Sequence, residues 1–161
     1  MATGSVQVYY GAGRGKSTAA LGRSILAASA GKTVFIIQFL KGKTDDGMEF
    51  LKRLEPEIKI FRFEKSEEYF NELSEEEQME EVKNIKNGLN FAKKVLSTGE
   101  CDLLILDEVL GLVDQSVIES EELKNLISVR LDDMELILTG REFCDAIHPY
   151  VDEVYHLISE D

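Results

Sequence analysis

A glycine-rich segment near the start of the chain has residue types that hold phosphate groups. Residues 11–18 read Gly-Ala-Gly-Arg-Gly-Lys-Ser-Thr and follow an alternating apolar segment, Val6–Tyr10. Glycines let the backbone curl tightly and turn its N–H groups toward a phosphate, and the start of a following helix adds partial positive charge. Lys16 supplies a point charge, and Ser17 supplies a hydroxyl suited to Mg²⁺. The segment is therefore predicted to be a phosphate-binding loop; the alternative is a glycine-rich turn whose lysine is incidental.

This loop departs from the standard phosphate-binding pattern at its first position. The standard pattern begins with a glycine where this chain has Tyr10, so the first glycine is Gly11 and the loop is one residue short. We expect a shortened loop to hold phosphates differently from the loop of an ordinary kinase or GTPase.

Two carboxylates follow an apolar segment further along the chain. Residues 103–106 are Leu-Leu-Ile-Leu, and Asp107 and Glu108 come directly after them. Acids at the tip of a strand beside a phosphate loop can bind Mg²⁺ directly or through water. The pattern is weak alone but specific downstream of such a loop, because the two signals predict one shared site.

Basic side chains follow two other apolar segments. Arg141 comes shortly after residues 134–138, where it either clamps a polyphosphate or is a solvated loop arginine. Lys41 follows residues 33–39, and from these residues alone a surface position is favoured for it.

Strands and helices are predicted to alternate along the chain, and this order places the candidate residues. Ser74 and Glu77 have the spacing of a capping box that starts a long helix, which Gly99 ends. Such alternation implies parallel strands joined by crossovers, with ligands beyond the carboxyl ends of the strands. The predicted fold is α/β, with a mostly parallel central sheet and helices on both faces, in a single domain over residues 1–161. The other predicted elements are strands at 6–10, 33–39, 58–63, 103–106, 134–138 and 154–157, and helices at 17–29, 48–54, 119–129 and 143–150.

The composition excludes several classes of protein. The 161 residues include 18 Lys and Arg against 31 Asp and Glu, a net charge of −13, which argues against a nucleic-acid binder or an anionic-membrane binder. Residues 1–43 contain basic side chains and no acid, which suggests that an anion is handled there. Cys101 and Cys144 lack metal-ligand spacing, and two buried thiols are favoured over the alternative of a lone disulfide. With no signal peptide and no apolar run long enough to span a bilayer, a cytoplasmic location is expected.

Taken together, the motifs resemble those of the P-loop ATP:corrinoid adenosyltransferases, also called cob(I)alamin or cob(I)yrinic acid a,c-diamide adenosyltransferases. That family has a shortened loop of the form Gly-Asn-Gly-Lys-Gly-Lys-Thr-Thr, which residues 11–18 resemble. The Gln-Phe-Leu-Lys-Gly of residues 38–42 and the Leu-Thr-Gly-Arg of residues 138–141 are similar to further family motifs. The resemblance implies a RecA-like P-loop NTPase fold. It also implies an enzyme that transfers the adenosyl group of ATP to a reduced Co(I) corrinoid and releases triphosphate.

The resemblance further implies roles for individual residues. Lys16 and Arg141 would be catalytic, because fixed positive groups stabilise the growing charge of a leaving triphosphate. Ser17, Glu108 and Asp107 would hold Mg²⁺. The implied ATP-binding residues are Gly11, Ala12, Gly13, Arg14, Gly15, Lys16, Ser17, Thr18 and Lys41.

The same resemblance implies a corrinoid end of the site and a set of partners. Members of the family carry an aromatic stretch after the third strand that lines the corrinoid pocket, and in this region the present chain has Tyr69 and Phe70. These two are the candidate corrinoid-binding residues, and core packing is the alternative for them. The expected substrates are ATP and a corrinoid, with Mg²⁺ as cofactor and with a reducing flavoprotein and a second copy of the chain as partners.

Two other functions stay open from the sequence. A small P-loop ATPase or kinase would release ADP or pyrophosphate instead of triphosphate. A non-catalytic ATP-binding protein, which handles corrinoids or regulates another process, would bind nucleotide without turnover.

Overall fold

Six parallel strands form the central sheet of the computed structural model, which describes residues 4–13, 15–40 and 51–160. The order across the sheet is β3-β2-β4-β5-β1-β6, and each recorded pairing between neighbours is parallel. The strands are β1 (Val6–Tyr10), β2 (Val34–Gln38), β3 (Ile58–Arg62), β4 (Leu103–Asp107), β5 (Glu135–Gly140) and β6 (Glu153–His156). The predicted α/β fold with a parallel sheet is confirmed.

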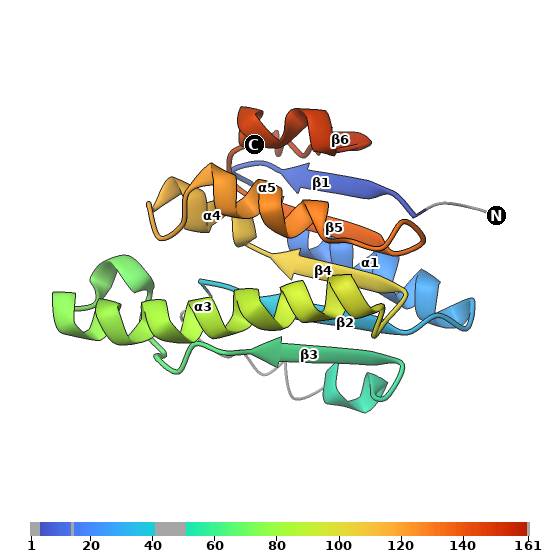
Figure 1. Ribbon diagram of the computed structural model, residues 1–161, viewed down its shortest axis with the longest axis horizontal. Helices are drawn as coiled ribbons and strands as arrows, with labels where there is room; N and C mark the ends of the chain where they lie inside the picture. Colours follow the sequence, from blue (N-terminus) through green and yellow to red (C-terminus); the bar gives the residue numbers. More distant parts are fainter. Residues whose placement is uncertain (1–3, 14, 41–50, 161) are drawn as a thin grey trace.

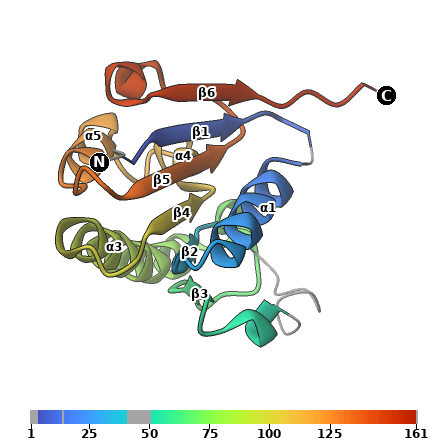
Figure 2. The same cartoon turned by 90° about the vertical axis from the view of Figure 1, so that its right-hand side faces the viewer.

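Helices cover both faces of this sheet. The α-helices are α1 (Lys16–Ser29), α3 (Glu75–Thr98), α4 (Val109–Asp114) and α5 (Ser120–Ser128). Short 3₁₀ helices follow β2, β3 and β5: η1 (Lys52–Leu54), η2 (Phe70–Glu72) and η3 (Asp145–Tyr150). Helix α1 lies on one face of the sheet, and α3, α4 and α5 lie on the other (Figure 1, Figure 2). The apolar core is accordingly divided by the sheet into a small cluster under α1 and a larger one under the other helices.

Helix α3 begins and ends at the predicted residues. The Ser74 hydroxyl accepts a hydrogen bond from the Glu77 amide at 3.2 Å, and the Glu77 carboxylate accepts one from the Ser74 amide at 3.3 Å. Gly99 ends the helix with a φ of +70°, a conformation that glycine adopts without a steric penalty. The capping box and the glycine stop are therefore confirmed.

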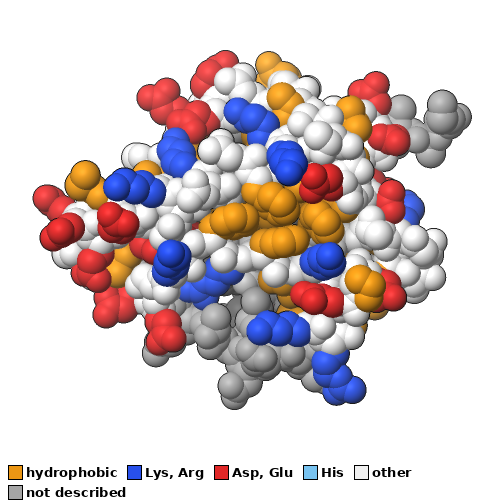
Figure 3. Space-filling model, turned by 60° about the horizontal axis from the view of Figure 1, so that its bottom comes forward, with side chains coloured by type: hydrophobic (Ala, Val, Ile, Leu, Met, Phe, Trp, Pro, Cys, Tyr) orange, Lys and Arg blue, Asp and Glu red, His pale blue; other side chains and the backbone are white. Residues whose placement is uncertain are grey.

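One margin of the sheet carries phenylalanines that are only partly covered. Phe35 of β2, Phe61 of β3 and Phe91 of α3 pack together, with ring centroids 4.8 to 6.3 Å apart. All of them are partly buried, and β3 is an edge strand. Figure 3 shows hydrophobic side chains gathered in the middle of the face that includes this edge, with both basic and acidic side chains around them.

Three helical segments differ from the sequence prediction. Helix α4 has no counterpart among the predicted elements, because Leu110, Gly111 and Leu112 are all buried and leave no polar face to produce a helical period. Within the predicted helix at 143–150, the residues Asp145–Tyr150 form a 3₁₀ helix, which contains Pro149. Of the predicted helix at 48–54, the part at Lys52–Leu54 is 3₁₀, and residues 48–50 lie outside the described residues.

The structure also describes the two cysteines and the apolar character of the helices. Cys101 and Cys144 are free thiols; Cys101 is buried and Cys144 is partly buried. Burial raises the pKa of the Cys101 thiol to about 12, so it stays protonated at neutral pH. Within the ranges that the structure describes, no helix combines the length and apolar character needed to cross a lipid bilayer.

Candidate functional site

The glycine-rich loop joins the carboxyl end of β1 to the first turn of α1. Gly15 precedes the helix with a φ of +114°, a conformation that residues with a Cβ rarely adopt. A Cβ on Gly11 would lie 2.1 Å from the carbonyl oxygen of Leu157, and a Cβ on Gly13 would lie 2.5 Å from Ser159 Oγ. The loop therefore needs glycine both for its backbone conformation and for its close packing against the segment after β6.

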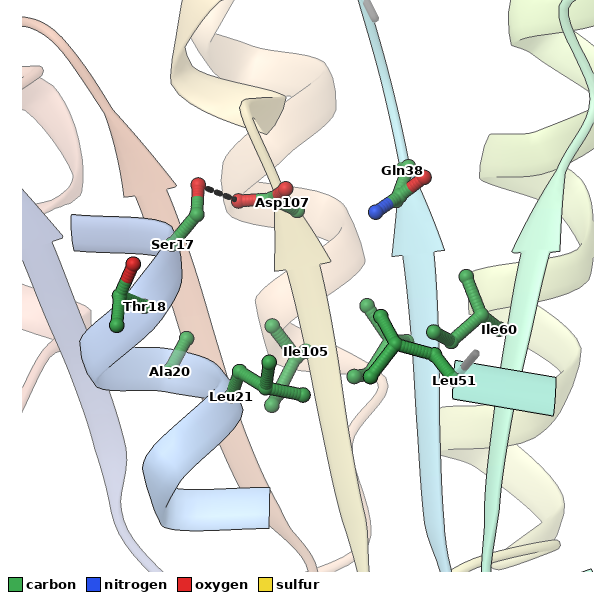
Figure 4. Close-up of a pocket in the computed structure, with 10 residues that line it drawn as sticks. Ser17, Thr18, Ala20, Leu21, Gln38, Leu51, Ile60, Ile105 and Asp107 are labelled. Carbon is green, nitrogen blue, oxygen red and sulfur yellow. Dashed lines mark hydrogen bonds between the residues drawn. The ribbon is translucent and has the colours of Figure 1, made fainter. Parts of the chain in front are cut away.

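Lys16 and Ser17 begin α1 and face two successive acids, Asp107 at the end of β4 and Glu108 directly after it. Lys16 Nζ lies 3.2 Å from Glu108 Oε1, and the two side chains are only 11% and 17% exposed. The Ser17 hydroxyl donates a hydrogen bond of 2.8 Å to Asp107 Oδ1 (Figure 4). The structure thus brings the glycine-rich loop and both acids together at the carboxyl ends of the strands.

Thr139 of β5 holds both acids in position. Strand β5 lies between β4, which ends at Asp107, and β1, which leads into the loop. The buried Thr139 hydroxyl donates to Asp107 Oδ1 at 2.8 Å and accepts from the backbone N–H of Glu108 at 2.8 Å. Glu108 has a left-handed φ of +64° and starts α4. Because the chain turns sharply there, the two successive carboxylates reach different partners, Ser17 and Lys16.

A cleft of about 950 Å³ opens beside the loop. Residues of the loop and the start of α1 line the cleft, together with Glu108 and Arg141. Residues at η2 and at the end of α4 also line it: Tyr69, Asn71, Glu72, Asp114 and Gln115. The lining of one cavity therefore includes cations suited to phosphates as well as aromatic and acidic side chains.

A smaller cavity of about 140 Å³ lies between α1 and the sheet (Figure 4). Leu21, Ile36 and Ile105 form part of its apolar lining, and Gln38 lies at the end of β2 in the same cavity. Ser17 lines both this cavity and the large cleft. The Ser17–Asp107 hydrogen bond is therefore placed where the two cavities approach each other.

The oxygen atoms around Ser17 suit a hard divalent cation. A hydroxyl and a carboxylate oxygen lie 2.8 Å apart, and Mg²⁺ in proteins is usually held by one or two carboxylates together with substrate phosphates and water. Among the described residues, no group of three or more His, Cys, Asp or Glu could hold a metal ion. The residues present fit an Mg²⁺ ion that arrives with a nucleotide better than a metal held by the protein alone.

Comparison with known proteins decides the family. The family model of the ATP:corrinoid adenosyltransferase BtuR/CobO/CobP matches residues 2–160. This chain belongs to that adenosyltransferase family. The resemblance seen in the short glycine-rich loop and its companion motifs is thereby confirmed.

Relatives in the adenosyltransferase family have low sequence identity to this chain, over most of the length of the chain. The corrinoid adenosyltransferase of Escherichia coli (strain K12) is 29% identical over 138 residues, which are 86% of this chain and 68% of that protein. The corrinoid adenosyltransferase CobA of Salmonella typhimurium (strain LT2) is 28% identical with the same coverage of both chains. A solved structure of EssC (ATPases 2 and 3) from Geobacillus thermodenitrificans gives a TM-score of 0.49 at 17% identity, and the match covers 97% of this chain and 32% of that one.

Several predicted site residues of this adenosyltransferase can be located. Ala12, Thr18 and the exposed Arg141 line the large cleft. Arg14 and Lys41 lie outside the described residues. Their predicted contacts with ATP therefore stay predictions.

The two candidate corrinoid-binding residues are placed differently. Tyr69 is 53% exposed and lines the cleft. Phe70 packs against the large apolar core instead, and its carbonyl accepts a hydrogen bond from the Gln78 side chain. The structure therefore brings Tyr69, and not Phe70, together with the loop.

Several other residues of the site were not predicted from the sequence. Thr139 lies inside the Leu-Thr-Gly-Arg motif, so a reading of that motif beyond its arginine could have singled it out. Asn71, Glu72, Asp114 and Gln115 are exposed polar residues. They belong to no motif or period, so only the fold reveals that they share one cleft.

A carboxylate beside the cleft has an unusual protonation equilibrium. Glu64 Oε1 accepts a hydrogen bond of 2.7 Å from the backbone N–H of Leu40, which lines the cleft. The pKa of Glu64 is raised to about 7, mainly by burial and also by the nearby Glu81 carboxylate, against the opposing effect of this hydrogen bond. The pKa of Asp114 is also raised, by burial and then by the Glu142 and Glu108 carboxylates.

Proposed function

We propose that this protein transfers the adenosyl group of ATP to a reduced Co(I) corrinoid and releases triphosphate. The observation that carries the proposal is the single cleft whose lining includes both the phosphate-binding loop and the exposed ring of Tyr69. Groups suited to a triphosphate and an exposed aromatic ring therefore line the same cavity. Membership of the ATP:corrinoid adenosyltransferase family supports the same assignment.

In the proposed reaction, the cobalt of the substrate is the nucleophile. The electron pair of Co(I) forms a bond to the ribose methylene carbon of ATP, while the bond from that carbon to the triphosphate oxygen breaks and its electron pair leaves with triphosphate. The protein therefore needs no nucleophilic serine or cysteine. Its tasks are to align the two substrates and to stabilise the charge of the leaving group.

Fixed positive groups near the loop supply that stabilisation. Lys16 Nζ is largely buried at the start of α1, and the helix N-terminus directs backbone N–H groups toward the loop. Arg141, from the same cleft, would neutralise the far end of the triphosphate. Ser17 and Asp107 would hold Mg²⁺, with Glu108 near them. When bound, Mg²⁺ supplies further charge neutralisation on the phosphate oxygens.

Tyr69 is proposed to contact the corrinoid. Its ring is the large aromatic side chain that lines the described part of the cleft, and half of it is open to solvent. An aromatic face provides apolar contact area for a macrocycle at little conformational cost.

The decisive experiment is anaerobic incubation of the protein with ATP, Mg²⁺ and chemically reduced cobalamin. We expect the cobalt spectrum to change as a cobalt–carbon bond forms, with triphosphate appearing in equal amount. Lys16→Ala should lower this rate by about 100-fold or more, as loss of a transition-state contact does. Lys32→Ala is the matched control, since Lys32 pairs with Glu135 on the surface.

The products separate this proposal from its rivals. Release of ADP or pyrophosphate without a cobalt–carbon bond would identify an ATPase or kinase. Nucleotide binding that corrinoid does not alter, with no turnover, would identify a non-catalytic protein.

Further parts of the proposal rest on the sequence and, for the homodimer and the flavoprotein, on the family resemblance. We propose that residues 1–161 act as one nucleotide-binding domain, that the protein works in the cytoplasm as a homodimer, and that a reducing flavoprotein delivers the electron that generates Co(I). Light scattering of the purified protein and reduction assays with a reduced flavoprotein would test the second and third of these points.

A further inference from the structure

Leu40 lines the cleft in a backbone conformation that residues with a side chain rarely adopt. It comes two residues after the end of β2 and has a φ of +59°. This left-handed region is sterically unfavourable for a residue with a Cβ, and it persists only where the surrounding structure holds it. The conformation of Leu40 therefore depends on contacts with other parts of the fold.

The side chain of Glu64 provides one of these contacts. Its Oε1 accepts a hydrogen bond of 2.7 Å from the backbone N–H of Leu40, which is 24 residues away in the chain. The preceding N–H, that of Phe39, donates to the carbonyl of Asp107 at 2.9 Å. The chain that leaves β2 is thus held on one side by the end of β4 and on the other by the segment after β3.

The backbone around Glu64 is itself held by two charged side chains. The guanidinium of Arg62, in β3, donates to the carbonyls of Glu64 and Ser66 at 3.3 and 2.6 Å. Glu81 of α3 is only 5% exposed, and its carboxylate accepts a hydrogen bond of 3.0 Å from the N–H of Lys65. Because the chain is anchored at these points, the partly buried Glu64 carboxylate is kept at its acceptor position.

The side chain of Leu40 packs closely against the first turn of α4. A Cβ on Gly111 would lie 2.8 Å from Leu40 Cδ1 and 3.7 Å from Glu108 Oε2, so the glycine makes room for the leucine. The Gly111 N–H donates to the Glu108 carbonyl at 3.1 Å, and all three residues line the cleft. A displacement of Leu40 would therefore also disturb Glu108, the carboxylate that pairs with Lys16.

We propose that Glu64 is a positioning residue for nucleotide binding, which acts by holding Leu40 against the first turn of α4 beside Glu108. This inference rests on the ATP-binding half of the proposed function, in which Glu108 lies near the nucleotide and its Mg²⁺. Glu64 is not among the described residues that line the cleft, so its effect on a ligand passes through Leu40.

The test measures the Kd for ATP by calorimetric titration in the presence of Mg²⁺. Glu64→Leu removes the acceptor and should raise this Kd by about fivefold, as expected for one lost hydrogen bond. Glu64→Gln should stay within about twofold of the wild type, because its side-chain oxygen can still accept from the Leu40 N–H. The effect of Glu64→Leu should be lost when EDTA replaces Mg²⁺, since Glu108 is proposed to act on the nucleotide near the ion.

Val95→Ala is the control for a loss of stability alone. Val95 is fully buried in the core on α3 and is not among the described residues of the cleft lining. Its truncation should lower the midpoint of urea unfolding but leave the Kd for ATP unchanged. A rise in Kd that followed stability alone would appear in this variant too and would contradict a positioning role.

Gly111→Ala tests the same contact from the side of α4 and does not depend on whether Glu64→Leu folds. The added methyl group displaces Leu40 Cδ1, the end of a flexible side chain, and should raise the Kd for ATP by a similar factor. The double variant Glu64→Leu with Gly111→Ala should bind ATP no more weakly than the weaker single variant, because both changes act through Leu40.

The contrary outcomes separate this inference from the proposed function. A Glu64→Leu protein that binds ATP as tightly as the wild type, or fully additive effects in the double variant, would overturn the positioning role. Neither result bears on adenosyl transfer, which the cobalt spectrum of the wild type tests. A wild type that binds no ATP would defeat both proposals.

Discussion

Lys16 Nζ lies 3.2 Å from Glu108 Oε1, so the cation of the phosphate-binding loop is paired before any nucleotide arrives. Both side chains are largely buried, and their attraction is screened less than that of a surface pair. A triphosphate must therefore share Lys16 with Glu108 or displace it. The carboxylate also places negative charge beside the site of a polyanion, unless Mg²⁺ offsets it.

Replacement of Glu108 tests this competition. Glu108→Gln removes the negative charge and frees Lys16, so we expect ATP to bind roughly tenfold more tightly when Mg²⁺ is chelated. With Mg²⁺ present, this gain in ATP affinity should shrink or reverse, because the variant lacks the Glu108 carboxylate, a candidate ligand of the ion. Calorimetric titration with and without EDTA measures both effects. Glu135→Gln, which breaks the exposed pair with Lys32, is the control, and equal gains in both variants would contradict the argument.

The hydroxyl of Thr139 provides a second prediction. Thr139→Val keeps the shape of the side chain but removes one hydrogen bond to Asp107 and one from the Glu108 amide, both at 2.8 Å in a buried position. We expect the free energy of unfolding in urea to fall by about 1–3 kcal/mol. Thr139→Ser keeps the hydroxyl and should recover most of the loss. A valine variant as stable as the wild type would show that these bonds are energetically unimportant.

Tyr69 and Phe70 should respond differently to truncation. Tyr69→Ala removes a cleft-lining ring, so the KM for corrinoid should rise about fivefold while the KM for ATP changes little. Tyr69→Phe should behave like the wild type, since the ring face is kept. Phe70→Ala should instead lower the free energy of unfolding by about 1–3 kcal/mol, because that ring packs against the core. Steady-state kinetics and urea unfolding are measured on all variants. A loss of stability in Tyr69→Ala together with a raised KM for corrinoid in Phe70→Ala would contradict the placement of Tyr69 in the cleft and Phe70 in the core.

Glu64 predicts a pH dependence of stability. Its pKa is about 7 in the folded protein against an ordinary value of 4.5, so the folded state binds more protons between these limits. The free energy of unfolding should therefore fall as pH rises from 4.5 to about 7 and change no further above that range from this group. Glu64→Gln removes the titration and can still accept from the Leu40 amide. Between pH 4.5 and about 7, the free energy of unfolding of the wild type should thus fall by on the order of 1–3 kcal/mol relative to that of Glu64→Gln.

Urea unfolding of both proteins at several pH values measures this difference. Glu67→Gln, an exposed residue of the same segment, is the control. A pH-independent difference between wild type and Glu64→Gln would refute the prediction.

The phosphate-binding chemistry of the loop could be predicted from the sequence, because it depends on residues that lie close together in the chain. The strand, the glycines and Gly-Lys-Ser follow one another directly, and the capping box at Ser74 and Glu77 is equally local. The meeting of Ser17 with Asp107 could also be expected, since parallel strands end at one edge of the sheet.

Features that depend on the order of strands could not be read in this way. Thr139 contacts both acids only because β5 lies next to β4. No single segment of the sequence determines the order of the strands in the sheet. Helix α4 is short and buried, so it lacks the amphipathic period that marks a helix. Glu72 and Asp114 meet at the cleft through the placement of η2 and α4, although an acidic stretch in sequence is most simply a solvated surface.

The position of β1 has a consequence for how the protein folds. The strand that carries the glycine-rich loop pairs with β5 and β6, which are far from it in the chain: Val6 pairs with Leu136, and Gln7 pairs with Glu153. The loop itself packs against Leu157 and Ser159 through Gly11 and Gly13. Contacts between residues so distant in the chain form late, because a long loop must close before they stabilise the fold. A chain that lacks β5 should therefore be unable to assemble the loop, so nucleotide binding requires a strand that is distant from the loop in sequence.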